Sequence, residues 1–393
     1  MTNSTPAPLR ILFLAPQPFF EVRGTPLAVR ALVTALLGEG HAVELLTYPQ
    51  GVDVDLPGLV HRRSLALPVG RVKAGPSLAK LLLDVPFLAQ AGWRLLRGRF
   101  DVVHAVEEAA HLVAPLARLL GVPLVADVDS SIPDQLRYSG FARRGPLLWA
   151  AEALESYALR RAAAVITVCG SLTEAVRARA PRAEIFQIED PPLVEEPAPE
   201  HVVADLRRSL GLDARPVVFY SGNFEPYQGV ELLVDAAVQL PEVQFVFMGG
   251  EPAEIERLRA RADGAACVFA GKRPPSELPA FLGLVDLVAS PRCKGTNTPF
   301  KIYTYLAAGK PLLATRIATH TQLLDDTLAF LVEPTPQGLA EGVRRILDAP
   351  AEASARARKG VELLERQYSR TCYEEKVARA YATVAARVAR GPA

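Results

Sequence analysis

Cysteine is scarce in this 393-residue chain, and its few copies are scattered. The four cysteines stand at Cys169, Cys267, Cys293 and Cys372, and none belongs to a CxxC pair or to a spacing typical of a metal site. This usage gives no sign of a structural metal centre, and it favours a reduced, cytoplasmic setting.

An excess of charge of either sign is also absent. The chain carries 44 Lys and Arg against 43 Asp and Glu, a formal net charge of +1, so no nucleic-acid partner is expected. Long uncharged apolar runs are lacking too, and the short run ILFLAP near the start has no charged segment of the signal-peptide kind before it. We therefore expect no membrane-spanning helix, while contact with a membrane surface stays open.

Several common catalytic motifs are missing. The sequence has no GxSxG elbow, no HExxH pair and no GxxxxGK[ST] phosphate loop. What the chain does have is a regular alternation of short apolar runs with amphipathic stretches, which predicts parallel sheets covered by helices on both faces. The predicted strands are residues 11–15, 42–47, 102–104, 124–128 and 164–168, and then 217–220, 244–248, 266–270, 284–289 and 311–315.

The alternation is interrupted once, at residues 190–200, which are rich in proline and acid. Proline fixes φ and withholds a donor, so this stretch predicts a linker. We therefore expect an α/β protein with two Rossmann-like, doubly wound domains, residues 1–190 and 201–372, facing a central cleft. The last helical stretch, within residues 373–393, is long and amphipathic enough to pack across both domains.

The most informative segment runs from residue 286 to residue 315. A strand is predicted to end at Ser290, a Gly/Thr/Asn loop follows, and Pro299 suits the first turn of a helix that ends at Gly309. A helix N-terminus with Lys294 and Lys301 beside it would form an anion site. An ordinary strand–loop–helix unit with solvated lysines fits the same residues.

Several motifs in this half occur together in one known family. They include Ser290-Pro291, Leu306-Ala-Ala-Gly-Lys-Pro311, Phe219-Tyr-Ser-Gly-Asn223 and Phe247-Met-Gly-Gly-Glu251. With them the chain resembles the retaining nucleotide-sugar glycosyltransferases of family 4, which have the GT-B architecture. The resemblance implies a nucleotide-diphosphate sugar as co-substrate, a glycosyl acceptor, retention of anomeric configuration, and no metal or other cofactor. It also implies that the donor binds mostly to the second domain and the acceptor mostly to the first.

The chain departs from the family at several donor-site positions. Asn223 and Gln228 stand where the family has a basic pair, and Thr296 and Thr304 stand where it has two glutamates. Amides bind phosphate less strongly than cations do, because charge-assisted hydrogen bonds are stronger. We interpret the chain as a divergent member in which Lys294, Lys301, Arg292 and the helix N-terminus hold the diphosphate.

The candidate site residues follow from these motifs and from the resemblance. For catalysis we name Asp129, as a contact to sugar hydroxyls or as a turn cap, His104, which with Glu107, Glu108 and His111 forms an acid/base cluster, and Glu251. No metal ligands are assigned, since Asp127-Val-Asp129 is a short and common pattern. The donor-binding candidates are Gly24, Thr25, Asn223, Gln228, Gly249, Gly250, Lys294, Thr296, Asn297, Thr298, Phe300, Lys301 and Thr304. At Gly24, a tight turn with Thr25 as N-cap and Pro26 at the first helical position is a complete local alternative.

Two apolar-basic stretches, residues 80–97 and 143–149, contain both tryptophans of the chain, Trp93 and Trp149. Tryptophan beside arginine is typical of an interfacial helix, which would make a peripheral contact at the inner face of a membrane. A core-facing amphipathic helix with a solvated basic edge fits as well, and we favour it.

Two other classes of function stay open. One is a non-catalytic or weakened sugar- or nucleotide-binding relative, which the altered donor positions would suit. The other is a different enzyme of the same architecture, such as an epimerase or a phosphorylase. The sequence does not name the sugar, the base or the acceptor.

Overall fold

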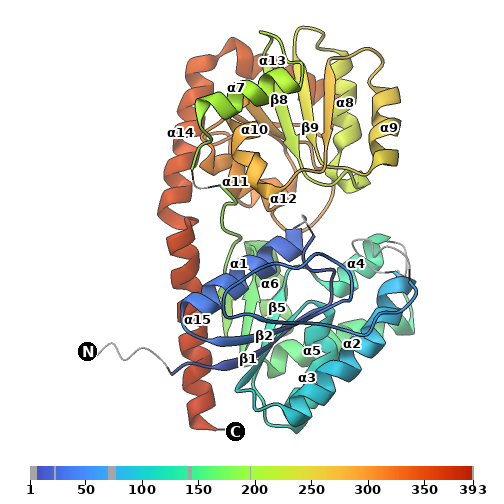
Figure 1. The fold of residues 1–393 in the computed structure, drawn as a ribbon, viewed down its shortest axis with the longest axis vertical. Coiled ribbons are helices and arrows are strands. Elements are labelled where there is room, and N and C mark those ends of the chain that lie inside the picture. The colour runs from blue at the N-terminus through green and yellow to red at the C-terminus, as the bar shows by residue number, and fades with distance from the viewer. Residues whose placement is uncertain (1–6, 22–23, 70–76, 140–143, 195, 392–393) are drawn as a thin grey trace. The chain divides into compact units, whose positions relative to one another are not determined.

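The computed structural model describes residues 7–21, 24–69, 77–139, 144–194 and 196–391. The chain forms two compact units, Met1–Glu189 with Tyr373–Ala393, and Asp190–Cys372 (Figure 1). Each is built on a parallel sheet whose strand order reverses direction near its middle. This confirms the predicted fold class of two doubly wound α/β domains.

The first unit has a seven-stranded sheet in the order β3-β2-β1-β4-β5-β6-β7, with all neighbours parallel. Its inner strands are almost wholly buried apolar runs, as expected where helices cover both faces. The strands are β1 (Arg10–Ala15), β2 (Ala42–Thr47), β3 (Val60–Arg63), β4 (Val102–Val106), β5 (Leu124–Val128), β6 (Ala164–Thr167) and β7 (Ile185–Gln187).

The helices of this unit divide between the two faces of the sheet. They are α1 (Gly24–Gly38), α2 (Leu78–Arg97), α3 (Glu108–Leu119), α4 (Ile132–Ser139), α5 (Pro146–Arg161), α6 (Gly170–Arg179) and, after the second unit, α15 (Arg370–Arg390). Buried residues of α2, α3, α5 and α6 pack in one core with Val103 and Ala105 of β4. His104, between those two, points to the opposite face and contacts Tyr381 of α15. Right-handed crossovers place α1 on that opposite face as well.

The second unit has a six-stranded sheet in the order β10-β9-β8-β11-β12-β13. Its strands are β8 (Val217–Ser221), β9 (Gln244–Met248), β10 (Cys267–Gly271), β11 (Leu287–Ser290), β12 (Leu312–Thr315) and β13 (Phe330–Val332). Its helices are α7 (Glu200–Ser209), α8 (Val230–Val238), α9 (Pro252–Arg261), α10 (Leu278–Leu284), α11 (Lys301–Ala307), α12 (Ala318–Thr321), α13 (Pro336–Asp348) and α14 (Pro350–Gln367), with short 3-10 turns η1 (Pro226–Gln228) and η2 (Pro275–Glu277).

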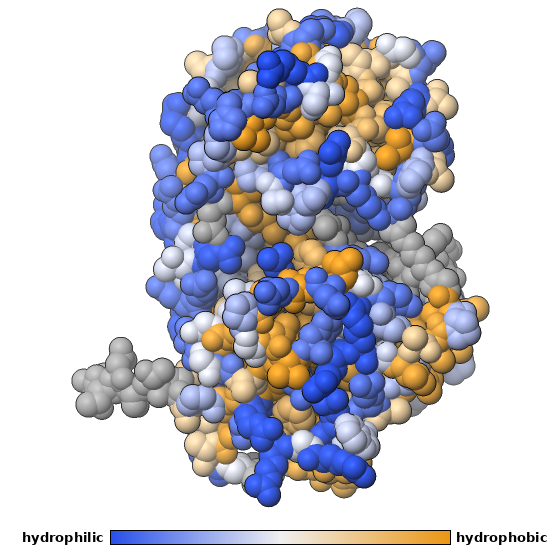
Figure 2. All heavy atoms as spheres, viewed as in Figure 1, coloured by the Kyte–Doolittle hydropathy of each residue, from blue (hydrophilic) through white to orange (hydrophobic). Residues whose placement is uncertain are grey.

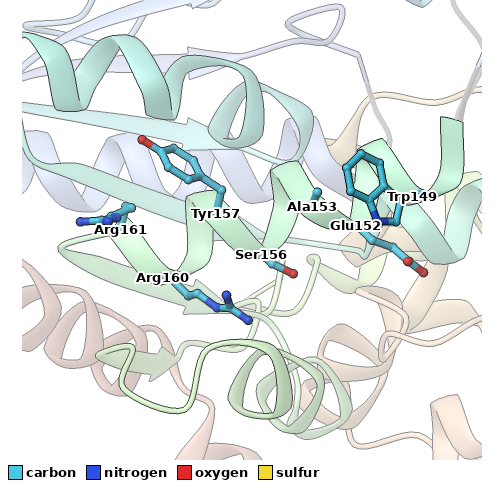
Figure 3. A pocket seen from close by; sticks show the side chains of 7 residues that line it. All are labelled: Trp149, Glu152, Ala153, Ser156, Tyr157, Arg160 and Arg161. Carbon is cyan, nitrogen blue, oxygen red and sulfur yellow. The ribbon is translucent and has the colours of Figure 1, made fainter. Parts of the chain in front are cut away.

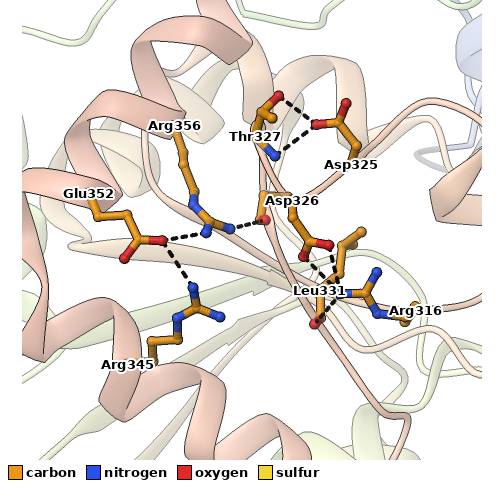
Figure 4. Close-up of polar contacts among 9 residues, drawn as sticks. Arg316, Asp325, Asp326, Thr327, Leu331, Arg345, Glu352 and Arg356 are labelled. Atoms are coloured by element: carbon orange, nitrogen blue, oxygen red, sulfur yellow. Dashed lines mark hydrogen bonds and ion pairs between the residues drawn. The ribbon is translucent and has the colours of Figure 1, made fainter.

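Arginine contacts close the outer edge of this sheet, at β13 (Figure 4). Arg356 of α14 donates to the carbonyl oxygen of Ala329 at 2.6 Å and to Glu352, and its guanidinium lies 4.1 Å from the ring centroid of Phe330. Arg345 of α13 donates to the same Glu352 at 3.0 Å. These contacts hold α13 and α14 against β13, the edge strand, which has a neighbouring strand on one side only.

All ten predicted strands are present, with small differences at their ends. The three strands that the apolar pattern did not predict, β3, β7 and β13, are all edge strands of three or four residues. An edge strand needs no continuous apolar run, and β3 reads Val-His-Arg-Arg.

Two predicted helix starts were wrong. α1 begins at Gly24, so Thr25 is its second residue and not its N-cap. α11 begins at Lys301, two residues after Pro299, and has only seven residues. The carbonyl oxygen of Pro299 accepts the amide of Ile302 at 3.0 Å in a preceding turn, which delays the regular helix.

Candidate functional site

Three loops of the second unit leave neighbouring strands at the same edge of its sheet. β8 ends at Ser221, β9 at Met248 and β11 at Ser290, and these strands are adjacent in the order β9-β8-β11. Carboxyl ends of parallel strands near the reversal of strand order are where doubly wound domains bind ligands. The loops after these strands carry most of the donor-binding candidates.

Glycine is required at this edge because the loops approach one another closely. Gly249 has a φ of +126°, and a Cβ atom there would lie 1.9 Å from the carbonyl oxygen of Gly222. Gly222 has a φ of +139°, and a Cβ atom there would lie 2.8 Å from Nζ of Lys301. The loops after β8 and β9 are thus in backbone contact, and the Lys301 ammonium group lies directly over the first of them.

Lys301 is the central cation of this edge. Its Nζ lies 3.8 Å from the ring centroid of Tyr220 and donates to Oε1 of Gln228 at 3.4 Å. Among the described residues, no carboxylate forms an ion pair with it. Burial, with the nearby positive charge of Arg292 as the second cause, holds the pKa of Lys301 well below its usual value. A desolvated cation without a carboxylate partner favours the arrival of an anion.

Arg292 supplies a second positive charge on the loop that follows β11. Its side chain is buried, and its guanidinium donates to the carbonyl oxygen of Lys294 at 2.8 Å and to Oδ1 of Asn297 at 3.0 Å. It also lies 5.3 Å from the ring centroid of Tyr227. Because a Cβ atom on Gly295 would lie 2.2 Å from the guanidinium, the loop closes around Arg292 only with glycine at that position.

A buried histidine fixes the start of the same loop. Nε2 of His320 lies 2.9 Å from Oγ of Ser290, and its Nδ1 lies 2.8 Å from the carbonyl oxygen of Thr315. Burial lowers the pKa of His320 to about 4, so the ring is neutral near pH 7. No sequence motif marks His320, because its partners on β11 and β12 are brought to it only by the folded sheet.

The structure brings some predicted donor residues together and separates others. Gln228 and Lys301 meet, Asn223 accepts the Tyr220 hydroxyl through its carbonyl oxygen at 2.7 Å, and Gly250 packs against the ring of Phe224. Thr304 is buried, and its hydroxyl accepts the amide of Leu193 at 3.0 Å, so it holds the segment before α7. The remaining candidates lie along the loop before α11: Lys294 is exposed, Thr296 and Asn297 are half-buried, Thr298 is buried, and Phe300 is the N-cap of α11.

In the first unit, His104 lies within the fold. Its side chain has no exposed surface, and its two ring nitrogens contact the hydroxyl of Tyr381 at 2.8 Å and Oδ2 of Asp127 at 3.1 Å. The ring also stacks on Phe13, with centroids 4.1 Å apart. These contacts join α15 to the sheet, and they leave His104 without a path to a substrate in this arrangement.

The four members of the predicted acid/base cluster do not gather. Glu107 and Glu108 both face Lys80 of α2, at 3.9 and 2.5 Å, away from His104. Burial raises the pKa of Glu108 to about 7. His111 is buried in α3, and burial lowers its pKa to about 4. His104 lies on β4, whereas Glu107, Glu108 and His111 lie at the start of α3 or within it. Closeness in sequence did not show that their side chains point in different directions.

The other candidates each lie at the end of a strand or the start of a helix. Asp129 follows β5 and is buried. Glu251 follows Gly250 and caps α9 in a reciprocal pair with Glu254, while its carboxylate also meets Lys272. Gly24 is exposed at the start of α1, where a Cβ atom would meet nothing within 4 Å. Among the described residues, no group of three or more His, Cys, Asp and Glu is placed to hold a metal ion.

Two doubly wound domains in one chain, each with a parallel sheet, are the architecture of GT-B proteins. Residues 23–189 match the family model of the glycosyl transferase 4-like domain, and residues 215–349 match that of the glycosyl transferases group 1. The chain therefore belongs to the GT-B glycosyltransferases, with a 4-like first domain and a group 1 second domain.

Known proteins agree with this assignment. The alpha-D-kanosaminyltransferase of Streptomyces kanamyceticus is 28% identical over 390 residues, which cover 90% of this chain and 98% of that protein. Among solved structures, sucrose-phosphate synthase from Thermosynechococcus elongatus has a TM-score of 0.80 at 20% identity, covering 96% of this chain and 100% of that one. The HepE protein of Anabaena in complex with UDP and glucose has a TM-score of 0.76 at 16% identity, covering 95% and 99%. These two structures are similar to the present chain in fold.

Proposed function

We propose that this protein transfers a sugar from a nucleotide-diphosphate sugar to a glycosyl acceptor, with retention of anomeric configuration and without a metal ion. The acceptor is a saccharide, a lipid-linked sugar or a small molecule. The observation that carries the proposal is Lys301, which lies over Gly222 beside Gln228 and near Arg292, with no carboxylate ion partner among the described residues.

The chemistry requires stabilisation of a leaving group. When the bond between the anomeric carbon and the phosphate oxygen breaks, its electron pair leaves with the nucleotide diphosphate, and negative charge grows there. Lys301 and Arg292 would oppose that charge in a partly dehydrated site, where electrostatic interactions are stronger than in water. In this proposal Lys301 and Arg292 hold the donor diphosphate, as the family's basic pair does at the positions of Asn223 and Gln228.

The remaining candidates take supporting parts in this proposal. Asp129, buried after β5, is proposed to contact sugar hydroxyls. His104 and Glu251 are proposed to position their segments, since His104 joins α15 to the sheet and Glu251 caps α9. We further propose a cytoplasmic setting, with the inner face of a membrane as the place of work when the acceptor is lipid-linked.

The proposal is tested by calorimetry of the full chain with a panel of nucleoside diphosphates, followed by incubation of the matching nucleotide sugars with and without candidate acceptors. Binding of a diphosphate together with sugar transfer or donor hydrolysis is expected, unchanged by a chelator. NMR of the product would show the anomeric configuration of the donor. Binding without any turnover would favour a non-catalytic relative. A product of inverted anomeric configuration would overturn the proposed retention, and loss of activity in chelator would overturn the proposed independence of a metal ion.

A further inference from the structure

Exposed apolar side chains gather on one layer of the first unit. Of the sixteen exposed large apolar residues in the described parts of the chain, eleven belong to α2, α3 and α5. These helices cover one face of the seven-stranded sheet, and α3 packs against both α2 and α5. Single exposed leucines are ordinary on protein surfaces, but a concentration on one layer marks a contact surface.

The largest contribution comes from α2, which is apolar on two opposite sides. One side buries Leu83, Phe87, Ala91 and Leu95 in the core. The other exposes a stripe at helical spacing, and Figure 2 shows apolar side chains at the surface where Figure 1 places α2. The stripe consists of Leu78, Leu81, Leu82, Val85, Trp93 and Leu96. The sheet covers only the first side of α2. The interpretation of α2 as a core-facing amphipathic helix, which the sequence favoured, therefore does not explain the apolar residues on its exposed side.

Both tryptophans of the chain lie on this layer and are exposed, and Trp93 lies near two arginines. Trp93 is 49% exposed, and the guanidinium groups of Arg94 and Arg97 lie 5.5 and 5.3 Å from its ring centroid. Trp149 is 71% exposed near the start of α5. An amphipathic indole with a cation beside it suits the boundary between lipid headgroups and acyl chains.

A groove of about 550 Å³ runs along the outer side of α5. Figure 3 shows Trp149 at one end of this helix side and Arg160 and Arg161 at the other, with Ser156 and Tyr157 between them. At the Trp149 end the groove is also lined by Glu152, whose charge is paired with Arg137. The indole at one end and the two arginines at the other match the two parts of a phospholipid, its chains and its phosphate.

The acidic groups of the three helices are neutralised or buried. Glu108 pairs with Lys80, Glu152 with Arg137, and Glu155 with Arg179. Asp84 is buried against the hydroxyl of Tyr48. Arg97, Arg118 and Arg161 form no ion pair among the described residues, so the charge that this layer offers to a partner is positive.

We propose that the layer formed by α2, α3 and α5 docks the protein on an anionic phospholipid bilayer. The apolar stripe of α2 and the two indoles enter the headgroup region, and the arginines contact lipid phosphates. The helix lies in the plane of the interface, and among the described residues no helix is long and apolar enough to cross a membrane. The docking does not rest on transferase activity, and donor binding in vesicle-free solution reports the proposed function separately.

The chain carries its own reporter, because both of its tryptophans lie on the proposed surface. Vesicles of phosphatidylglycerol and phosphatidylcholine should co-sediment the full-length protein and shift its tryptophan emission to shorter wavelength. Brominated phosphatidylcholine in the same vesicles should quench that emission. Vesicles of phosphatidylcholine alone should bind much less, and salt should weaken binding to the anionic vesicles.

Variants separate the apolar part from the charged part. Leu82→Ser with Val85→Ser should lower the vesicle partition coefficient about tenfold, whereas Val202→Ser with Val238→Ser, exposed on the second unit, should leave it unchanged. Arg97→Glu with Arg161→Glu should abolish the preference for anionic lipid, and Arg358→Glu on α14 serves as its control. Trp93→Phe and Trp149→Phe, each alone, assign the emission shift to one helix.

The proposal is overturned if wild-type emission neither shifts nor is quenched with anionic vesicles. It is also overturned if the control variants lose binding as much as the α2 variants do. Analytical sedimentation without lipid measures the oligomeric state, and so tests whether a second copy of this chain covers the layer instead of lipid. A dimer that shields both indoles from aqueous quencher, and that Leu82→Ser with Val85→Ser dissociates, would assign the layer to self-association instead.

Discussion

Nζ of Lys301 lies 3.8 Å from the ring centroid of Tyr220, close enough for a cation–π contact. Tyr220 lies on β8, and its hydroxyl donates to the carbonyl oxygen of Asn223, in the loop after that strand, at 2.7 Å. An aromatic face stabilises a cation without neutralising it. The charge of Lys301 is therefore held in place and remains available to an anionic ligand.

Lys301→Ala should weaken nucleoside diphosphate binding roughly tenfold to a hundredfold, because it removes a charge-assisted contact from a partly dehydrated site. Calorimetry measures the affinity, and circular dichroism checks that the fold is intact. Lys359→Ala, an exposed lysine on α14, is the matched control and should bind as wild type does. Equal affinity in Lys301→Ala and wild type would reject Lys301 as the phosphate anchor.

Asn223→Arg with Gln228→Lys restores the basic pair of the family and should tighten diphosphate binding. In the empty site the new lysine lies beside Lys301, since Gln228 now accepts from Nζ at 3.4 Å, so like charges should lower the melting temperature without ligand. A diphosphate should then raise that temperature by more than it does in wild type, as thermal shift measures. A smaller ligand-induced shift than in wild type would show that the phosphates bind elsewhere.

Donor binding should take up a proton at alkaline pH. The pKa of Lys301 is lowered in the empty site by burial and by Arg292, and an arriving diphosphate favours the charged form. The contribution of Lys301 to affinity should be constant below its empty-site pKa, and it should fall by up to about tenfold per pH unit between that pKa and the higher pKa of the bound state. Calorimetry above pH ~7.5, where phosphate groups with a pKa of about 6 no longer titrate, measures the uptake in buffers of different ionisation enthalpy. Lys301→Met should abolish it, and the same uptake in that variant would contradict the assignment.

Gly249→Ala should destabilise the second unit by at least about 2 kcal/mol. The added Cβ atom would lie 1.9 Å from the carbonyl oxygen of Gly222, and the φ of +126° is unfavourable for alanine. Urea unfolding measures the loss. Gly38→Ala in α1 meets nothing within 4 Å and should be neutral or slightly stabilising. Equal stability of the two variants would mean that the loops after β8 and β9 do not touch.

Tyr381→Phe should cost the first unit about 1–2 kcal/mol, because it leaves a ring nitrogen of the fully buried His104 without its partner on α15. Hydrogen exchange should then show faster opening of α15 than in wild type. The comparison is Tyr157→Phe, which alters a residue on the open groove of α5 and should change neither quantity. Unaltered exchange in Tyr381→Phe would show that α15 is held by apolar contacts alone.

The sequence by itself determined the class of fold and predicted where the candidate site lies. Inner strands such as residues 11–15 and 217–220 are continuous apolar runs, and a run buried on both faces is visible without coordinates. The glycines and lysines that follow such runs indicated the carboxyl edge of the second sheet. Lys301 was predicted in this way, from its place near a helix N-terminus and from the loss of the family's basic pair at Asn223 and Gln228.

Only the tertiary structure decided which side chains meet. Leu193 and Thr304 hydrogen-bond across 111 positions of sequence, and His104 reaches Tyr381 across 277. Short edge strands such as Val60–Arg63 carry no buried run of their own, so pairing within the sheet defines them. The apolar pattern of α2 fits both a core and a surface, and the packing of the sheet settled which side of the helix is covered. The helical spacing of apolar residues shows that a helix has an apolar face, but only the folded structure shows what packs against that face.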